Sequence, residues 1–339
     1  MTSLPLRRVV SPAVLAMSLL VGRVVSPVGL AMSLLVRRVV SLVGLVAVVL
    51  AGWASPASAH AGGLVATDAR SRVVSVTPSV PGMSVATIED GAKLRLVNGT
   101  ASVVAIPPGG GPAAPATVAA GHTAMWADSR TSPVGKRIGA GAVRPWTLVL
   151  EVAGAAVTVT GVLEGASPPA FVVWWGATLA LVVAIPVVCR RSGRSGGSGR
   201  SRRGEVVLAG AGLVAMAASI AHVTGSTMEV VSAPALGTFV SAAGVNLLAW
   251  PLILGGAVAA YRGRPAGLLA VCAGAALTAV SVLPDVTSFH RAVLPFAGPD
   301  AIERVLVVLA LGAGVGTAVA GGAVLRGLAA QEARAGEPA

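Results

Sequence analysis

Five long apolar segments constrain the fold of this chain more than any other feature. Their interiors contain no Asp, Glu, Lys or Arg, and they cover residues 169–189, 206–224, 236–261, 266–284 and 305–325. A helix of about 20 residues crosses the hydrocarbon core of a bilayer, so the sequence predicts five transmembrane helices. The composition of the whole chain supports this prediction, since 55% of its residues are hydrophobic and only 11% are charged. This composition excludes a water-soluble globular protein.

The charge pattern predicts how these helices are oriented. Six arginines lie between the first and second apolar segments, whereas the loops on the other side carry Glu229, Asp285, Asp300 and Glu303. Arginine-rich loops stay in the cytoplasm. Together with the five predicted spans, this pattern predicts a multi-pass protein of the cell membrane with these arginines on the cytoplasmic side. Residues 60–168 are then extracytoplasmic and the C-terminus is cytoplasmic.

The net charge of the chain predicts a contact with membrane lipid. The chain has a formal charge of +12, and one basic cytoplasmic loop accounts for half of that excess. Arginines beside a bilayer favour contact with anionic membrane lipid. Nucleic-acid binding is therefore not predicted.

The N-terminal 59 residues are interpreted as a leader. A period of 15 residues repeats in RRVVSPAVLAMSLLV, GRVVSPVGLAMSLLV and RRVVSLVGLVAVVL. From residue 32 onward a basic stretch, an apolar stretch and small residues follow in the order of a secretion signal. Cleavage is predicted after Ala59, which makes His60 the mature N-terminus. The translation start is left open among Met1, Met17 and Met32.

Residues 60–168 are predicted to form one small β domain. Short runs rich in Val, Thr, Ile and Leu alternate with turn signals, and Asn98-Gly99 is the strongest hairpin signal among them. Such a pattern without helical periodicity predicts an antiparallel β-sandwich of immunoglobulin-like type. The expected strands cover residues 73–76, 84–88, 93–97, 101–106, 146–152 and 156–163.

The membrane region is predicted to have two parts. A first helix at 169–189 is followed by an Arg/Gly/Ser-rich cytoplasmic linker at 190–204, a four-helix domain at 205–326 and a tail at 327–339. Glycines in the linker make it flexible. The first helix is therefore expected to be a tether that is loosely coupled to the other four.

Two details of the helices follow from residue type. Pro251 is expected to kink the third segment, where Asn246 also lies, and to produce a polar break. Small residues recur at four-residue intervals at Gly312, Gly316 and Ala320. That spacing lets helices approach closely, so helix packing is predicted there.

Polar residues at the predicted outer ends of the helices include metal-ligand types. Imidazole, thioether and carboxylate groups together suit copper or zinc, and they occur at His222, Met228, Glu229, Asp285 and His290. Cleavage before His60 would add an α-amine and an imidazole that chelate one ion. The ordinary polarity of solvated loops explains the same residues and is favoured. The prediction is accordingly no cofactor, with copper as the alternative.

Groups that carry catalysis are scarce in the sequence. His222 is the only ionisable residue in its apolar segment, and the next three have none in their interiors, which disfavours a proton-coupled pump. Cys189 and Cys272 are isolated, and no nucleophile–base grouping stands out. The chain is therefore predicted not to be an enzyme. Asp128 and Arg130 beside Trp126 are interpreted as a structural ion pair, with a recognition patch as the alternative.

The order of a signal peptide, a β-rich exported domain and C-terminal membrane helices resembles a family of uncharacterised actinobacterial membrane proteins. The likeness covers most of residues 60–325 and is best in SRVVSVTPSVPG, KLRLV, MWADSR and PWTLVLEVAGAAVTVTGVL. In that family the third stretch commonly reads Trp-His-Asp-His-Arg followed by another His. Here Ala127, Ser129 and Ser132 stand at the histidine positions. The resemblance therefore implies no metal role for this segment.

The predicted mature start, HAGG, and the domain layout are also similar to copper-resistance proteins that join a periplasmic copper-binding domain to a membrane importer. The methionine-rich and paired-histidine patterns of copper handling are missing here. The leading hypothesis is a non-enzymatic envelope protein that displays its β domain for binding or assembly, with an envelope protein as partner. Copper or other metal uptake or delivery is the alternative.

Overall fold

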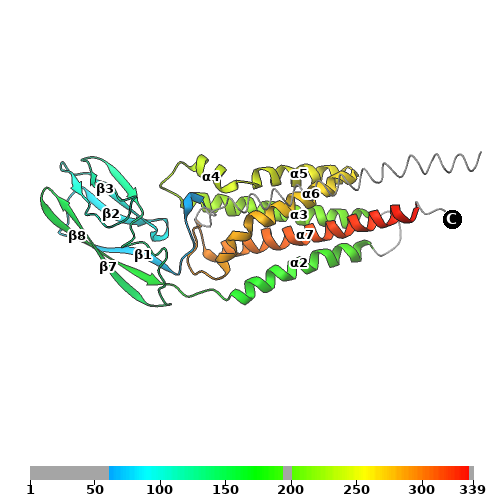
Figure 1. The fold of residues 1–339 in the computed structure, drawn as a ribbon, viewed down its shortest axis with the longest axis horizontal. Helices are drawn as coiled ribbons and strands as arrows, with labels where there is room; N and C mark the ends of the chain where they lie inside the picture. Colours follow the sequence, from blue (N-terminus) through cyan, green and yellow to red (C-terminus); the bar gives the residue numbers. More distant parts are fainter. Residues whose placement is uncertain (1–60, 194–200, 336–339) are drawn as a thin grey trace, which may run out of the picture. The chain divides into compact units, whose positions relative to one another are not determined.

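The computed structural model describes residues 61–193 and 201–335. The leader with its repeat, the cleavage site, His60, the glycine-rich part of the linker and the last four residues of the predicted tail lie outside the described residues. Within them, a β-rich N-terminal region is followed by α-helices (Figure 1).

Eight strands form two antiparallel sheets, as the alternating sequence pattern predicts. One sheet has five strands in the order β1-β8-β7-β4-β5, and the other has three in the order β2-β3-β6. The strands are β1 (Ala69–Thr77), β2 (Met83–Ile88), β3 (Lys93–Asn98), β4 (Val104–Ala105), β5 (Thr117–Val118), β6 (Thr123–Trp126), β7 (Val143–Val152) and β8 (Ala155–Gly165).

Both sheets contribute to one hydrophobic core. Buried and exposed residues alternate along β7, where Leu148 and Leu150 are buried and Val149 is exposed. Leu94 and Trp126 from the three-stranded sheet belong to the same buried cluster. Each sheet therefore places one apolar face in a common interior, which is the reason for the period-two pattern in the sequence.

The hairpin predicted at Asn98-Gly99 is wrong. β3 pairs with β2 and β6, whereas β4 pairs with β5 and β7, so this turn passes from one sheet to the other. The buried Asn98 side chain determines the path, because its amide donates to the carbonyl oxygens of Ser102, Val118 and Ala119. Tertiary hydrogen bonds thus override the local turn preference.

The helices are α2 (Phe171–Gly193), α3 (Ser201–Glu229), α4 (Ala235–Ala243), α5 (Asn246–Tyr261), α6 (Pro265–Val282) and α7 (Asp300–Ala335). Four of them are long and apolar enough to cross a membrane, and the bent pair α4–α5 makes a fifth crossing if it counts as one span. The chain is thus a multi-pass membrane protein by helix length and composition.

The third apolar segment is broken by 69° between α4 and α5. The break lies at Gly244, whose φ of +47° suits glycine and whose N–H caps α4 by donating to the carbonyl of Val240. α5 begins at Asn246 and continues through Pro251. The expected break beside Asn246 is present, but glycine rather than proline makes it.

Glycines on α7 allow close helix packing. Gly312 and Gly316 face Leu181 and Ile185 of α2, and Gly314 faces α6, where a methyl group would lie 2.8 Å from the carbonyl oxygen of Ala275. The packing predicted for Gly312 and Gly316 is confirmed. α2 is thus packed against α7 rather than attached as a loose tether.

Candidate functional site

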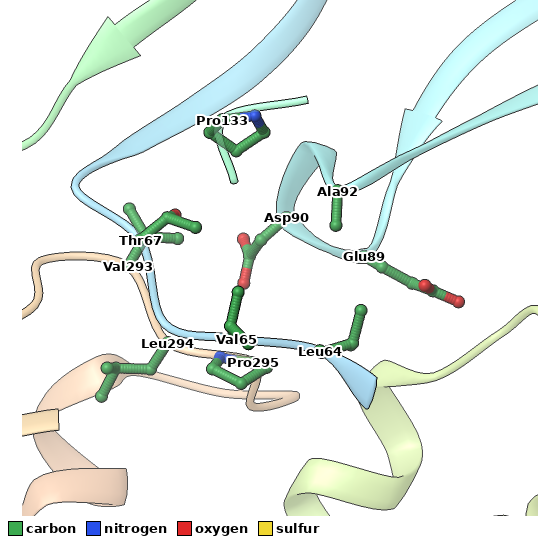
Figure 2. Close-up of a pocket in the computed structure, with 10 residues that line it drawn as sticks. All are labelled: Leu64, Val65, Thr67, Glu89, Asp90, Ala92, Pro133, Val293, Leu294 and Pro295. Carbon is green, nitrogen blue, oxygen red and sulfur yellow. The ribbon is translucent and has the colours of Figure 1, made fainter. Parts of the chain in front are cut away.

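The β-rich region meets the helices in a polar junction. The junction joins residues 64–68 and 89–93 to residues 230–232 and 291–300. Figure 2 shows the 64–67 segment between the η3 turn (Glu89–Gly91) and the 293–295 segment. Thr67 and Val293 form an antiparallel bridge with backbone hydrogen bonds of 2.9 and 3.0 Å. Backbone pairing therefore contributes directly to the attachment.

Glu89 and Lys93 anchor one side of this junction. One oxygen of the buried Glu89 carboxylate accepts from the backbone N–H of Ser232 at 3.0 Å, and the other lies 2.9 Å from Lys93 Nζ. Lys93 Nζ also donates to Ser232 Oγ at 2.7 Å. The pairing satisfies two charges that burial would otherwise make costly.

Ion pairs hold the other side. Arg291 pairs with Asp68, and Arg70 lies 3.0 Å from Asp90 Oδ1 and 3.4 Å from Asp300 Oδ2. Burial raises the pKa of Asp90; Arg70 opposes that shift, and the nearby Asp300 carboxylate adds to it. Arg70 is thus shared between two acids.

A buried acid–histidine cluster lies at the end of the helices that faces the junction. His222 of α3 places Nε2 3.1 Å from Asp285 Oδ2 and Nδ1 2.6 Å from Glu303 Oε1. Asp285 belongs to η4 (Leu283–Phe289), and Glu303 lies in the first turn of α7. All three residues are more than nine-tenths buried. We refer to these three residues as the His222 cluster.

Arg304 holds the loop beside this cluster. Its buried guanidinium donates to the backbone carbonyls of Ser288, Arg291 and Ala292. These are carbonyls at and after the end of η4, which have no helical partner of their own. Arg304 thereby fixes the η4 turn that carries Asp285 close to α7.

A small polar cavity of about 20 Å³ adjoins the His222 cluster. The polar residues that line it are His222, Ser226, Asn246, Ser281 and Asp285. Ser281 donates to Asn246 Oδ1 at 2.9 Å. The hydroxyl of Ser226 is buried and has no hydrogen-bond partner among the described residues. The cavity is therefore polar, lined by residues of α3, α4, α5, α6 and η4 together with Ala61, and its hydrogen-bonding groups are incompletely satisfied.

Five of the six residues predicted for a metal site are described, and His60 lies outside the described residues. Among these five, only His222 and Asp285 form an ion pair with each other, and Met228 is 66% exposed. His290 accepts from the indole N–H of Trp175 and stacks on Phe171. No group of three or more His, Cys, Asp or Glu in residues 61–193 and 201–335 is arranged to hold a metal ion.

Sequence reasoning placed these acids in solvated loops, and the structure corrects that. Asp285 and Glu303 are each only 3% exposed, because η4 and the start of α7 fold inward against α3. Glu303 was not among the predicted ligands. One feature of the sequence could have identified Glu303. It lies in the first turn of a helix that follows a mostly apolar segment, and such a position argues against a solvated loop.

The Trp126–Asp128–Arg130 segment is a structural unit. The Asp128 carboxylate is fully buried and accepts from Trp126 Nε1 at 3.2 Å and from Arg130 Nε and Nη2 at 2.9 and 2.7 Å. A methyl group on Gly110 would collide with these groups, so the glycine-rich loop packs directly on the pair. The structural interpretation is therefore supported over a recognition patch.

Comparison with known proteins adds no assignment. No protein-family model matches the chain, and no curated protein or solved structure matches it.

Proposed function

We propose that this chain is a non-enzymatic, multi-pass envelope protein that displays its β region outside the membrane for binding or assembly with an envelope protein. The observation that carries this proposal is the junction. Backbone pairing at Thr67–Val293 and the Glu89–Lys93–Ser232 contacts attach the β region to the helices at several points. A domain held in this way suits presentation of one surface.

The free sheet face is the surface that we assign to a partner. The core covers one side of β7, and the other side exposes Thr147, Val149 and Glu151. On β1 of the same sheet, Val74 is 56% exposed. β-Branched side chains have few rotamers, so they bury area at little cost in conformational entropy. We infer further that the two sheets form a β-sandwich, since they share one core.

Arginine placement supports the sidedness. Arg190 and Arg191 end α2, and Arg202 and Arg203 begin α3. The junction end carries only two arginines, Arg291 and Arg304, between residues 283 and 304, among the acids Asp285, Asp300 and Glu303. Under the positive-inside rule, this arrangement favours an extracytoplasmic β region and a cytoplasmic C-terminus.

Photo-crosslinking in the cells that express the full chain tests the proposal. A benzophenone side chain at Val149 should give a discrete adduct with one envelope protein, and Thr147→Glu in the same chain should abolish that adduct. A matched probe at Val183, exposed on α2, should give lipid adducts only. The proposal fails if Val149 yields no protein adduct, or if its adduct is unaffected by Thr147→Glu.

A further inference from the structure

The His222 cluster has no part in the proposed display function. Its three ionisable side chains come from three separate elements and are buried inside a helical membrane region. A buried ion network is often no more stabilising than apolar residues of similar size. Ionisable groups inside membrane regions characteristically mark sites where ions or protons bind. The cluster therefore calls for a functional explanation of its own.

We propose that His222, Asp285 and Glu303 form a proton-binding site, and that one water molecule in the adjacent cavity exchanges the proton. Both ring nitrogens of His222 face carboxylate oxygens, at 3.1 and 2.6 Å. A neutral imidazole would turn one lone pair towards a carboxylate, whereas the imidazolium carries a proton on both nitrogens. The two distances thus suit the protonated ring, and the Nδ1 contact is a close ion pair rather than an aligned hydrogen bond.

The cavity provides the place for the water. Its volume of about 20 Å³ exceeds the roughly 10–15 Å³ that one water molecule requires. Ser226 is 3% exposed and lines this cavity, and its hydroxyl has no partner among the described residues. Buried hydroxyls are nearly always hydrogen-bonded to protein or water. A water molecule here would satisfy Ser226 beside His222 and Asp285.

The charges around the His222 ring are compatible with binding and release of one proton. Asp285 and Glu303 face the two nitrogens, and the Arg304 guanidinium lies next to them on backbone carbonyls. With His222 as imidazolium, two negative charges meet two positive ones. The other walls are uncharged, and α4, α5 and α6 contribute Ala242, Asn246, Ser281 and Val282.

Proton release begins at one bond of the ring. The Nε2–H bond breaks, its electron pair stays on the ring, and the proton passes to Asp285 Oδ2, which faces Nε2 and belongs to a residue that lines the cavity. The cavity water then takes the proton from that carboxyl group as hydronium, which restores the carboxylate. Uptake is the reverse, so neither oxidant nor reductant takes part. Ala61 of η2 (Ala61–Gly63) completes the cavity wall and is buried.

Nitrogen-15 NMR of the full chain in lipid nanodiscs tests the site directly. With labelled histidine, the resonances absent from His222→Gln belong to His222. We expect these resonances to be those of imidazolium near neutral pH, and to convert reversibly to neutral imidazole as the pH of the bath is raised. His290→Gln is the matched control and should leave them unchanged, because His290 contacts Trp175 and Phe171 instead.

Two further variants separate a proton site from a purely structural network. Glu303→Gln keeps the shape of the side chain and should reduce the fraction of imidazolium at a given pH. Ser226→Ala removes only a hydroxyl and should slow exchange of the His222 proton by several-fold, even where the acid variant fails to fold. Resonances of His222 that never change while the protein stays folded would overturn the proposal. Exchange that is equally fast in Ser226→Ala would overturn the role of the cavity water.

Discussion

Asp128 has no exposed surface, and four hydrogen bonds converge on its carboxylate. Burial by itself would raise the pKa of Asp128. The hydrogen bonds from the Arg130 side chain and backbone and from Trp126 outweigh it, and the pKa lies below its usual value. The ionised carboxylate is therefore the form that the fold stabilises.

Replacing Asp128 with Asn should destabilise the protein. Asn keeps the size of the side chain but loses the charge-assisted bonds to Arg130, which are worth about 1.5–3 kcal/mol. Thermal unfolding of the full chain in detergent, followed by tryptophan fluorescence, measures the change. Glu151→Gln, on the exposed side of β7, is the control and should have no effect. An equal melting temperature for wild type and Asp128→Asn would contradict the structural role.

The same variant has a predictable pH dependence. A lowered pKa in the folded state means that the stabilisation by Asp128 is present above the unfolded pKa of about 4 and is lost as pH falls through the folded value. The difference in melting temperature between wild type and Asp128→Asn should therefore shrink below pH ~4. A difference that grows in acid would show that another group is responsible.

Asp90 should behave in the opposite way. Its pKa is raised, so its contribution to stability is present in acid and is lost as pH rises through the folded pKa. Asp90→Asn removes this penalty and keeps a residue that tolerates the φ of +51° found there. Relative to wild type, the melting temperature of the variant should rise between about pH 4 and pH 7. A relative loss over that range would indicate that the pair with Arg70 outweighs burial.

At the scale of elements, the α5–α6 contact depends on glycine. A methyl group on Gly256 would lie 2.7 Å from both the Gly267 carbonyl oxygen and the Val271 nitrogen, whereas one on the adjacent Gly255 would meet nothing within 4 Å. Gly256→Ala should therefore cost about 1–3 kcal/mol through overpacking. Gly255→Ala should be neutral or stabilising by up to about 1 kcal/mol. Melting temperatures of the two variants in the same detergent give the comparison, and equal values would contradict the packing.

The position of the break between α4 and α5 also depends on the packing and backbone conformation of whole elements. Hydropathy alone describes residues 236–261 as one span, but the chain turns by 69° at Gly244. Pro251 is the sixth residue of α5, so it removes a hydrogen bond from the interior of the helix, yet α5 continues through it. The sharp break lies at Gly244 instead, because glycine provides the backbone conformation that the break requires.

At the scale of the whole molecule, the sidedness can be measured by cysteine labelling. In a background without Cys189 and Cys272, a membrane-impermeant maleimide should label Ala120→Cys in intact cells, because arginine-rich loops stay in the cytoplasm. Gly197→Cys should react only after the membrane is permeabilised. Labelling in the reverse order would invert the proposed orientation and remove the basis of the display function.

Local properties of the chain were sufficient to predict the β-rich region, its antiparallel pattern, the apolar helices and the close packing at Gly312 and Gly316. Hydropathy and strand alternation depend on a few neighbouring residues. Both patterns reflect whether a side chain faces lipid, water or the protein interior. The Asp128–Arg130 pair was predictable for the same reason, since its members are two residues apart.

Which distant groups meet depends on the packing of whole elements and could not be predicted from local sequence. Asn98 bonds to backbone 20 residues away and sends β3 and β4 to different sheets. His222 contacts Asp285 and Glu303, which lie more than 60 residues further along the chain. The sequence placed these two acids in loops, but they are buried with His222 in one cluster. No local pattern encodes such contacts, because they depend on how whole elements pack once their apolar surfaces are covered.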